Sequence, residues 1–291
     1  MSTVPAASSA DEGPLALVCG GGTLPLAVAE SISKRGRTVV LFGLRGAADG
    51  AVVERFPHHW VHIGQIGKFM RLARAAGCRD VVFIGSLVRP SLWHVHPDLK
   101  GLRMLGGVLA AFRGGDNHLL SGMGRLLEQD GFRLLGAHEV APEILVPEGL
   151  LGRGKVSQSD RDDIAVGFDC LRAIGPFDVG QAVVVAGKHV LAVEAAEGTD
   201  HMLARVAQMR ANGRVRASPG NGVLVKAAKS GQDRRFDLPS IGPRTVDGVV
   251  EAGLAGIAVV AGETIVAEPE RVVEKADRAN IFVTGVAGTK A

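Results

Sequence analysis

Short apolar runs alternate with helix-like segments through the first half of the chain. Leu15–Cys19 is an apolar run followed at once by three glycines, and Thr23-Leu24-Pro25 then opens a segment with helical spacing. Thr23 suits the N-cap of a helix and Pro25 its first turn. Further strands are predicted at 38–42, 60–63, 80–84 and 132–135, and further helices at 65–76, 98–112 and 118–129. This alternation predicts a Rossmann-like, mostly parallel sheet in an N-terminal domain over 15–140.

The pattern changes near residue 140. Two prolines and three glycines, with little periodicity, occupy 138–158, so 141–158 is interpreted as a crossover linker. Beyond it, the sequence predicts a hairpin of 182–186 and 189–194, strands at 222–225, 256–260, 264–267 and 281–283, and helices at 159–173, 200–210, 244–252 and 270–278. Hairpins mixed with crossovers predict a C-terminal mixed α+β domain over 159–291.

The ends of the chain and its cysteines bear on location. Residues 1–14 are small and polar and lack the basic start and apolar middle of a signal peptide, so they are interpreted as a disordered tail. No apolar run approaches the roughly 18 residues that a membrane span needs. The three cysteines are far apart and odd in number, which fits a reducing compartment. We expect a soluble, cytoplasmic protein.

Composition narrows the classes of partner. The net charge of +3 is mild and not gathered in a run, and aromatic residues make up only 4% of the chain, with no Tyr. Nucleic-acid binding is not indicated, because single-stranded nucleic acid needs stacking rings and duplexes need basic patches. The 40 glycines suit tight turns and close backbone approaches, as in phosphate-binding α/β proteins.

The glycine turn Gly20-Gly21-Gly22 lies between the first strand and the first helix. It matches neither the GxGxxG nor the GxxxxGK[ST] pattern. It could bind a phosphate or sugar at the helix N-terminus, or be a tight structural turn, and both alternatives stay open. Phe42-Gly43-Leu44 ends the second strand without the acidic residue that would hold an NAD ribose, which weakens a dehydrogenase interpretation.

Small and polar residues also follow other strands of the first domain. Gly64-Gln65 and Gly85-Ser86 stand at predicted strand ends, and Arg89 comes shortly after. Ligands of open α/β sheets bind outside the carboxyl ends of the strands. With the glycine turn, these residues are expected to line one crevice and bind substrate, unless each only caps a helix or makes a turn.

Histidines concentrate in the first half. His58, His59 and His62 form an HHxxH pattern, and His94 and His96 an HxH pattern. No cysteine or carboxylate completes a zinc set at the usual spacing. Solvated loop histidines are the favoured interpretation.

The most charged stretch of the second half is 226–239, which follows an apolar strand. It carries Lys226, Lys229, Asp233, Arg235 and Asp237. Carboxylates can hold a divalent metal, and the metal and the lysines can hold phosphates. The alternative is a solvated loop with surface ion pairs, which contribute little to stability.

Two carboxylates upstream could join this stretch. Glu194 ends the predicted hairpin, and Asp200 stands at the start of a helix. If the hairpin lies beside the strand before Lys226, then Glu194, Asp200 and Asp233 could converge on Mg²⁺ or Mn²⁺, since hard cations take oxygen ligands. For Thr199-Asp200 the alternative is ordinary helix capping. Gln181, Thr199 and Gln232 are assigned to substrate binding.

Several motifs together resemble one family. They are CGGGTLPL at 19–26, IGQIGK at 63–68, IGSLVRP at 84–90, DVGQAVVV at 178–185, VEAAEGTD at 193–200 and KAAKSGQDRRFDLPSIGPRT at 226–245. In order and spacing they resemble the UDP-2,3-diacylglucosamine pyrophosphatase of lipid A synthesis, of the two-domain type unrelated to calcineurin-like phosphoesterases. The resemblance covers about 15–286, nearly the whole chain.

The resemblance implies a reaction and a place for it. UDP-2,3-diacylglucosamine would be hydrolysed to UMP and 2,3-diacylglucosamine 1-phosphate (lipid X), with water attacking the phosphorus nearer the sugar. Mg²⁺ would be the cofactor, the active site would lie between the two domains, and the protein would sit peripherally at the cytoplasmic face of the inner membrane. The sequence leaves the oligomeric state open, a homodimer included.

The resemblance also implies roles for residues. An essential aspartate of a QDxRxD segment corresponds to Asp233 as first choice and Asp237 as second, while Ser230 replaces the family's usual proline. Lys226, Lys229 and Arg235 would clamp the diphosphate, and Asp233 would bind the metal or orient the water. The acyl chains could lie along 99–112, for which an ordinary core helix is the favoured alternative, or along 144–146.

Two rival functions stay open at this point. One is a nicotinamide-dependent oxidoreductase on the first domain, which the missing ribose acid disfavours. The other is a non-catalytic protein that binds a nucleotide-sugar or lipid, which the carboxylates and lysines of the second half disfavour.

Overall fold

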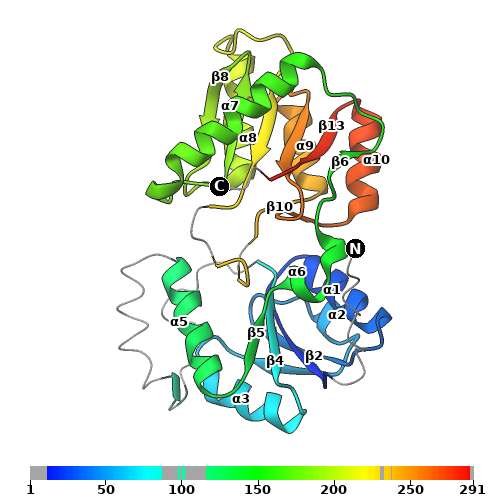
Figure 1. Ribbon diagram of the computed structural model, residues 1–291, viewed down its shortest axis with the longest axis vertical. Helices are drawn as coiled ribbons and strands as arrows, with labels where there is room; N and C mark the ends of the chain where they lie inside the picture. The colour runs from blue at the N-terminus through cyan, green and yellow to red at the C-terminus, as the bar shows by residue number, and fades with distance from the viewer. Residues whose placement is uncertain are drawn as a thin grey trace, which may run out of the picture. The chain divides into compact units, whose positions relative to one another are not determined.

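The computed structural model describes residues 12–86, 98, 100–101, 116–229, 233–236 and 238–288. It divides into two compact units, each with its own large sheet (Figure 1). The first unit holds the described residues up to Pro142 together with Asp233–Phe236, and the second holds the others from Glu143 onward. Most of the predicted helix at 98–112 lies outside the described residues, as do Arg89, His94 and His96.

The first unit is built on a parallel sheet with strand order β3-β2-β1-β4-β5. Its elements are β1 (Leu15–Cys19), α1 (Leu24–Lys34), β2 (Val39–Leu44), α2 (Gly50–Val53), β3 (His58–Val61), α3 (Ile66–Ala75), β4 (Asp80–Ile84), α5 (Asp116–Gln129), β5 (Arg133–Leu135) and α6 (Ala137–Val140). This order, with β1 in the centre, is that of a doubly wound fold. The predicted Rossmann-like sheet is confirmed.

Helices cover both faces of this sheet (Figure 1). On one face, Phe69 and Met70 of α3 and Leu127 of α5 pack against Val18, Phe42 and other strand residues. On the other side, α1 lies against β1 and β2. Pro25 stands in the first turn of α1 as expected, whereas Thr23, at the N-cap, makes no side-chain capping hydrogen bond.

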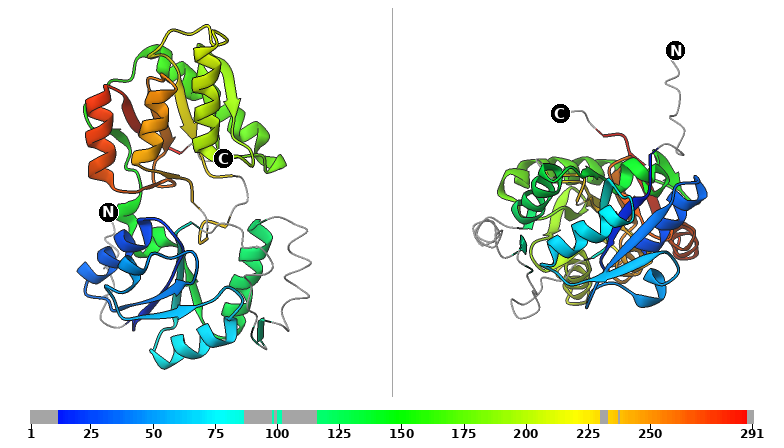
Figure 2. Two further views of the ribbon diagram at one scale, coloured as in Figure 1. Left: turned by 180° about the vertical axis from the view of Figure 1, so that it is seen from behind. Right: turned by 90° about the horizontal axis from the view of Figure 1, so that it is seen from below.

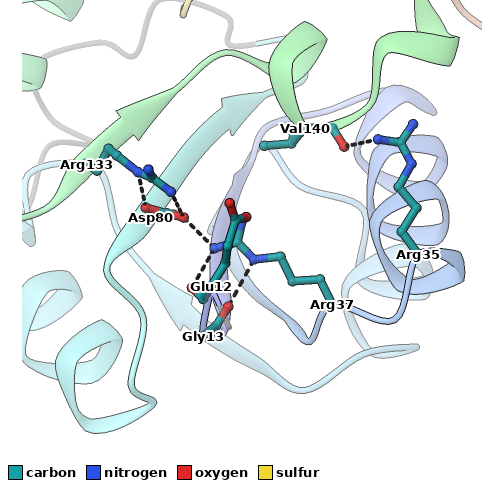
Figure 3. A network of polar contacts seen from close by, with 7 residues as sticks. All are labelled: Glu12, Gly13, Arg35, Arg37, Asp80, Arg133 and Val140. Carbon is teal, nitrogen blue, oxygen red and sulfur yellow. Dashed lines mark hydrogen bonds and ion pairs between the residues drawn. The ribbon is translucent and has the colours of Figure 1, made fainter. Parts of the chain in front are cut away.

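A network of ions ties the amino edge of this sheet together (Figure 3). Asp80, at the start of β4, is 2% exposed and accepts hydrogen bonds from both Arg37 and Arg133. Arg37 also donates to the Glu12 carboxylate and to the Gly13 carbonyl. A pocket of about 260 Å³ opens beside it. These cations each have acidic or carbonyl partners, so the network is a structural anchor for the chain entering β1.

The second unit has the elements β6 (Gly149–Leu151), α7 (Gln158–Ile174), β7 (Ala182–Ala186), β8 (His189–Val193), α8 (Gly198–Ala211), β9 (Val223–Lys226), β10 (Ser240–Ile241), α9 (Pro243–Glu251), β11 (Gly256–Val260), β12 (Ile265–Val266), α10 (Pro269–Ala279) and β13 (Phe282–Val286). Its large sheet has the order β6-β13-β11-β9-β7-β8. The strands β9, β11 and β13 are parallel, and β6, β7 and β8 pair antiparallel with their neighbours. The predicted mixed sheet is confirmed.

This sheet is the middle of three layers. Ile164 and Leu171 of α7 pack on one face against Val183 and Val225. The other face is covered by α8, α9 and α10, which lie side by side in the left view of Figure 2. Local signals set the start of α7. Ser157 is its N-cap, and the Ser157 and Asp160 side chains each accept a hydrogen bond from the backbone N–H of the other residue.

Two segments differ from the sequence-based expectation. The stretch 141–158, predicted as a linker, supplies the edge strand β6, which pairs with β13 and whose Gly149 carbonyl accepts a hydrogen bond from Thr284. Asp233–Phe236, predicted within the C-terminal domain, groups with the first unit. The reason is packing: the ring of Phe236 lies 5.5 Å from that of Phe83, at the end of β4.

Candidate active site

The glycine turn of the first unit is held by the end of β4. Gly21 and Ser86 form an isolated β-bridge, in which each backbone N–H donates to the carbonyl of the other residue at 2.8 and 2.9 Å. A Cβ on Gly20 would lie 2.5 Å from the Ser86 carbonyl oxygen, and one on Gly21 would lie 3.1 Å from Ser86 Oγ. The structure therefore brings Gly20, Gly21 and Ser86 together at the carboxyl edge, as expected. Contact with a ligand there stays a prediction.

Gly22 differs from its two neighbours. Its φ is +90°, a region that side chains rarely adopt, and no atom lies near the position of an added Cβ. The glycine at this position is thus explained by backbone conformation, while Gly20 is explained by close approach of another strand. Both reasons are those of a tight turn. They do not decide whether the turn also binds a phosphate or sugar at the N-terminus of α1 or is structural only.

Gln65 has a local role in the structure. It is the N-cap of α3, and its Oε1 accepts hydrogen bonds from the His62 N–H and from Lys68 Nζ. It follows the edge strand β3, and β2 separates that strand from β1. The described contacts therefore favour a local turn before α3 for Gln65, whose side chain makes no capping hydrogen bond.

Four predicted residues of the second unit form one polar network. Lys226, at the end of β9, is only 4% exposed, and its Nζ donates to Thr199 Oγ1 and to the Ser240 carbonyl, both at 3.0 Å. The Thr199 hydroxyl donates to Glu194 Oε1 at 2.9 Å, and the Gln181 N–H donates to Glu194 Oε2 at 3.2 Å. Lysines are rarely buried unless they are paired, so this network is what allows Lys226 to lie inside.

Two further features adjoin the network along the chain. Gln181 Oε1 is buried and has no hydrogen-bond partner among the described residues. Lys229, three residues after Lys226, forms an ion pair with Asp178 at 2.7 Å. Gln232 and Asp237, also predicted for this site, lie outside the described residues.

Asp233 and Arg235 form a second polar group, in the first unit. Asp233 Oδ1 accepts from the Arg235 backbone N–H and Nε, and Oδ2 accepts from Nη2 at 2.8 Å. The Arg235 side chain lowers the pKa of Asp233 below its ordinary value, outweighing partial burial, which raises it. The same contact raises the pKa of Arg235, and burial opposes it. Asp233 is therefore a carboxylate at neutral pH.

Sequence patterns did not indicate two partners of these groups. Arg235 Nη1 donates to Glu128 at 2.6 Å, from the last turn of α5, and Lys226 donates to a backbone carbonyl, that of Ser240. Glu128 stands in an ordinary helical segment with no motif around it. A carbonyl carries no side-chain signal, so only tertiary structure could reveal these contacts.

The predicted metal set does not fit the contacts in the structure. Each Glu194 oxygen accepts a hydrogen bond from within the chain, and Asp200 pairs with Arg244 at 2.6 Å on the surface. Asp233 is engaged by Arg235. Within the described ranges, no three His, Cys, Asp or Glu residues lie close enough together to hold a metal ion.

The histidines expected in a solvated loop lie elsewhere. His58 and His59 belong to β3 and are half-buried. The His59 ring lies 5.4 Å from that of Phe42, and His58 Nδ1 lies 2.9 Å from the Phe56 carbonyl oxygen. The loop assignment was wrong for these two residues. Polar residues do not give the apolar pattern of a strand, although these two side chains pack at the edge of the sheet.

Comparison with known proteins identifies the family of the chain. Residues 14–144 match the LpxI N-terminal domain, and residues 147–284 match the LpxI C-terminal domain. The chain is also 42% identical over 272 residues to UDP-2,3-diacylglucosamine pyrophosphatase LpxI of Caulobacter vibrioides, covering 94% of this chain and 97% of that protein. The two matches follow each other along the chain in the order of the two units, and the chain belongs to the LpxI family.

Proposed function

We propose that this protein hydrolyses the diphosphate of UDP-2,3-diacylglucosamine to UMP and 2,3-diacylglucosamine 1-phosphate, in lipid A synthesis. The observation that carries the proposal is the 42% identity to a pyrophosphatase of that name over nearly the full length of both chains. The buried Lys226 and its network support it, because diphosphate binding needs fixed cations. The enzyme is a hydrolase of a phosphorus anhydride.

Residues of the stretch 226–239 have different roles in this reaction. Water attacks the phosphorus nearer the sugar and a new P–O bond forms. The bond from that phosphorus to the bridging oxygen breaks, and the oxygen leaves with UMP and takes the electron pair. The protons of the water pass to the phosphate products and to solvent. Asp233 accepts a hydrogen bond from the attacking water and orients it, since its lowered pKa keeps it ionised and a carboxylate can only accept. Lys226, Lys229 and Arg235 offset the charge that develops on the diphosphate.

Substitution of Asp233 tests this assignment. We expect Asp233→Asn to lower kcat on the order of 10²-fold or more, as removal of a group that positions a reactant does. Asp169→Asn is the matched control, because Asp169 is an exposed carboxylate paired with Arg172 on α7. Release of UMP is measured, with circular dichroism as a check of folding. A folded Asp233→Asn protein with normal turnover would remove Asp233 from the mechanism.

Contact with a membrane surface is part of the proposal. No helix among the residues that the structure describes is long and apolar enough to cross a membrane. Phe177 is 77% exposed and Val179 39% exposed, and between them Asp178 is held by Lys229. An exposed aromatic residue on a fixed turn suits shallow insertion into a bilayer at its cytoplasmic face, where the lipid substrate lies.

Vesicle sedimentation tests that contact. With vesicles that contain phosphatidylglycerol, we expect Phe177→Ser to lower the bound fraction several-fold. Val250→Ser, at an exposed apolar position on α9, should bind as the unmodified protein does. Equal binding of the two variants would exclude the Phe177 turn as the membrane contact.

A further inference from the structure

The Glu194 carboxylate is enclosed by its own unit. It is 6% exposed and follows β8. Its two oxygens accept hydrogen bonds from two different segments, the Gln181 N–H before β7 and the Thr199 hydroxyl in the first turn of α8. Gly180 leaves room for this arrangement, because a Cβ there would lie 2.0 Å from the Glu194 carbonyl oxygen. Glu194 thus joins the hairpin to the start of α8.

The hydrogen bond to Glu194 decides what Thr199 can do. A hydroxyl has a single hydrogen, and a carboxylate can only accept, so the Thr199 hydrogen points at Glu194. The Thr199 oxygen then offers its lone pairs elsewhere, and Lys226 Nζ donates to it at 3.0 Å. The relay runs one way, from Lys226 through Thr199 to Glu194.

The ammonium group of Lys226 is therefore held in a fixed orientation. Its second described acceptor is the Ser240 carbonyl, which belongs to β10. A lysine side chain has four rotatable bonds and a flexible head, so two fixed acceptors remove freedom that a phosphate would otherwise have to remove on binding.

We propose that Glu194 is a positioning residue, which holds Thr199 as an acceptor and thereby aims Lys226 at the substrate diphosphate, and that it is not a metal ligand. The proposal rests on the proposed function, in which Lys226 binds the diphosphate. It replaces the sequence-based assignment of Glu194 to a metal set, with which the described contacts disagree.

Four variants test the relay. Glu194→Gln and Thr199→Val should each lower kcat/KM on the order of 10²-fold, mainly through KM, because the clamp is misplaced rather than removed. Glu194→Gln/Thr199→Val should be no worse than either single variant, since members of one relay do not act additively. Thr199→Ser restores the hydroxyl and should keep nearly full activity. Glu274→Gln is the control, because it makes the same carboxylate-to-amide replacement at an exposed position on α10.

Two measurements besides turnover separate positioning from metal binding. The Mg²⁺ concentration for half-maximal activity should be unchanged in Glu194→Gln, and calorimetric binding of inorganic pyrophosphate without metal should weaken in both single variants. A several-fold rise in the Mg²⁺ requirement of Glu194→Gln alone, with Thr199→Val unaffected, would overturn the proposal. Multiplying effects in the double variant would overturn it as well.

A Lys226→Met variant distinguishes this inference from the proposed function. Full activity of folded Lys226→Met would refute the role of Lys226 in binding the diphosphate, and the relay that depends on that role would be refuted with it. Loss of activity in Lys226→Met beside normal kinetics in Glu194→Gln would leave the proposed clamp intact and refute only the positioning role of Glu194.

Discussion

Arg235 encloses the Asp233 carboxylate with three donors of its own: its backbone N–H, Nε and Nη2. The two residues are two positions apart along the chain, and the third guanidinium nitrogen, Nη1, donates to Glu128. Arg235 is thus both a partner of the proposed water-orienting residue and its link to α5. A charge-assisted bidentate pair of this kind fixes geometry as well as charge.

The pH dependence of activity should depend on this pair. Asp233 acts as a carboxylate, and Arg235 lowers its pKa below the ordinary value of about 3.9. Activity on the acid side should therefore persist until the pH falls below about 4. In Arg235→Met the pKa of Asp233 rises, so the acid limb of kcat/KM should move to higher pH.

A pH series of UMP release from pH 3.5 to 8 measures this shift. Glu128→Gln is the matched control, because it removes the other partner of Arg235 and leaves the contact with Asp233 in place. Its acid limb should move less than that of Arg235→Met. Identical acid limbs in Arg235→Met and the unmodified protein would contradict the role of the pair.

Stability should depend on Asp80 at the amino edge of the first sheet. Burial raises the pKa of Asp80, but hydrogen bonds from Arg133 and Arg37 outweigh it and leave that pKa below its ordinary value. Asp80→Asn removes the buried carboxylate that Arg37 and Arg133 share and leaves Arg37 with the exposed Glu12 carboxylate. The loss in the free energy of unfolding should therefore approach, without exceeding, the cost of about 3–5 kcal/mol for breaking a buried pair. Urea denaturation at pH 7 measures it.

The sign of the pH effect follows from the lowered pKa. The Asp80 contribution is fully present above the unfolded pKa of about 3.9 and is lost as the pH falls through the lower folded pKa. Asp80→Asn should therefore lose less stability than the unmodified protein on acidification below about pH 4. Asp169→Asn, on the surface, should change stability by less than about 1 kcal/mol. Equal effects of the two substitutions would contradict the structural role of the network.

The three thiols should differ in reactivity. Burial raises the pKa of Cys19 to about 12 and that of Cys78 to about 11, whereas Cys170 is half-buried. Because the thiolate is the reactive form, iodoacetamide at pH 8 should label Cys170 first and the other two only after unfolding. Mass spectrometry of the labelled peptides reads this out, and in guanidinium all three should react. Labelling of Cys19 at the rate of Cys170 in the folded protein would show that β1 opens easily.

Removal of divalent metal should affect catalysis and not folding. The resemblance implies Mg²⁺ as a cofactor, and the described residues contain no group of three metal-binding side chains that could hold a structural ion. EDTA should stop UMP release, and excess Mg²⁺ or Mn²⁺ should restore it. The thermal midpoint should stay the same within about 1 °C, since removing an ion that the native protein does not bind leaves its stability unchanged. A clear fall in that midpoint would indicate a metal bound to the protein alone.

Much of the fold was predictable because local signals agreed with it. Strands at 80–84 and 256–260 were predicted at their observed bounds, and the hairpin turn at Gly187-Lys188 formed as expected. These segments combine apolar runs with glycines at their ends, so pattern and turn chemistry indicate the same element. The short strands β6 and β10 were not predicted, because two or three residues carry too little periodicity.

The sequence by itself determined the α/β class, the family resemblance and a set of candidate residues, of which the fold brings together Gln181, Glu194, Thr199 and Lys226. Only the tertiary structure decided which groups Glu194 contacts. Spacing along a chain shows that carboxylates are available, but it does not show which donors reach them. Here the Thr199 hydroxyl and the Gln181 N–H reach Glu194 first, because the hairpin and the start of α8 fold against one another around it.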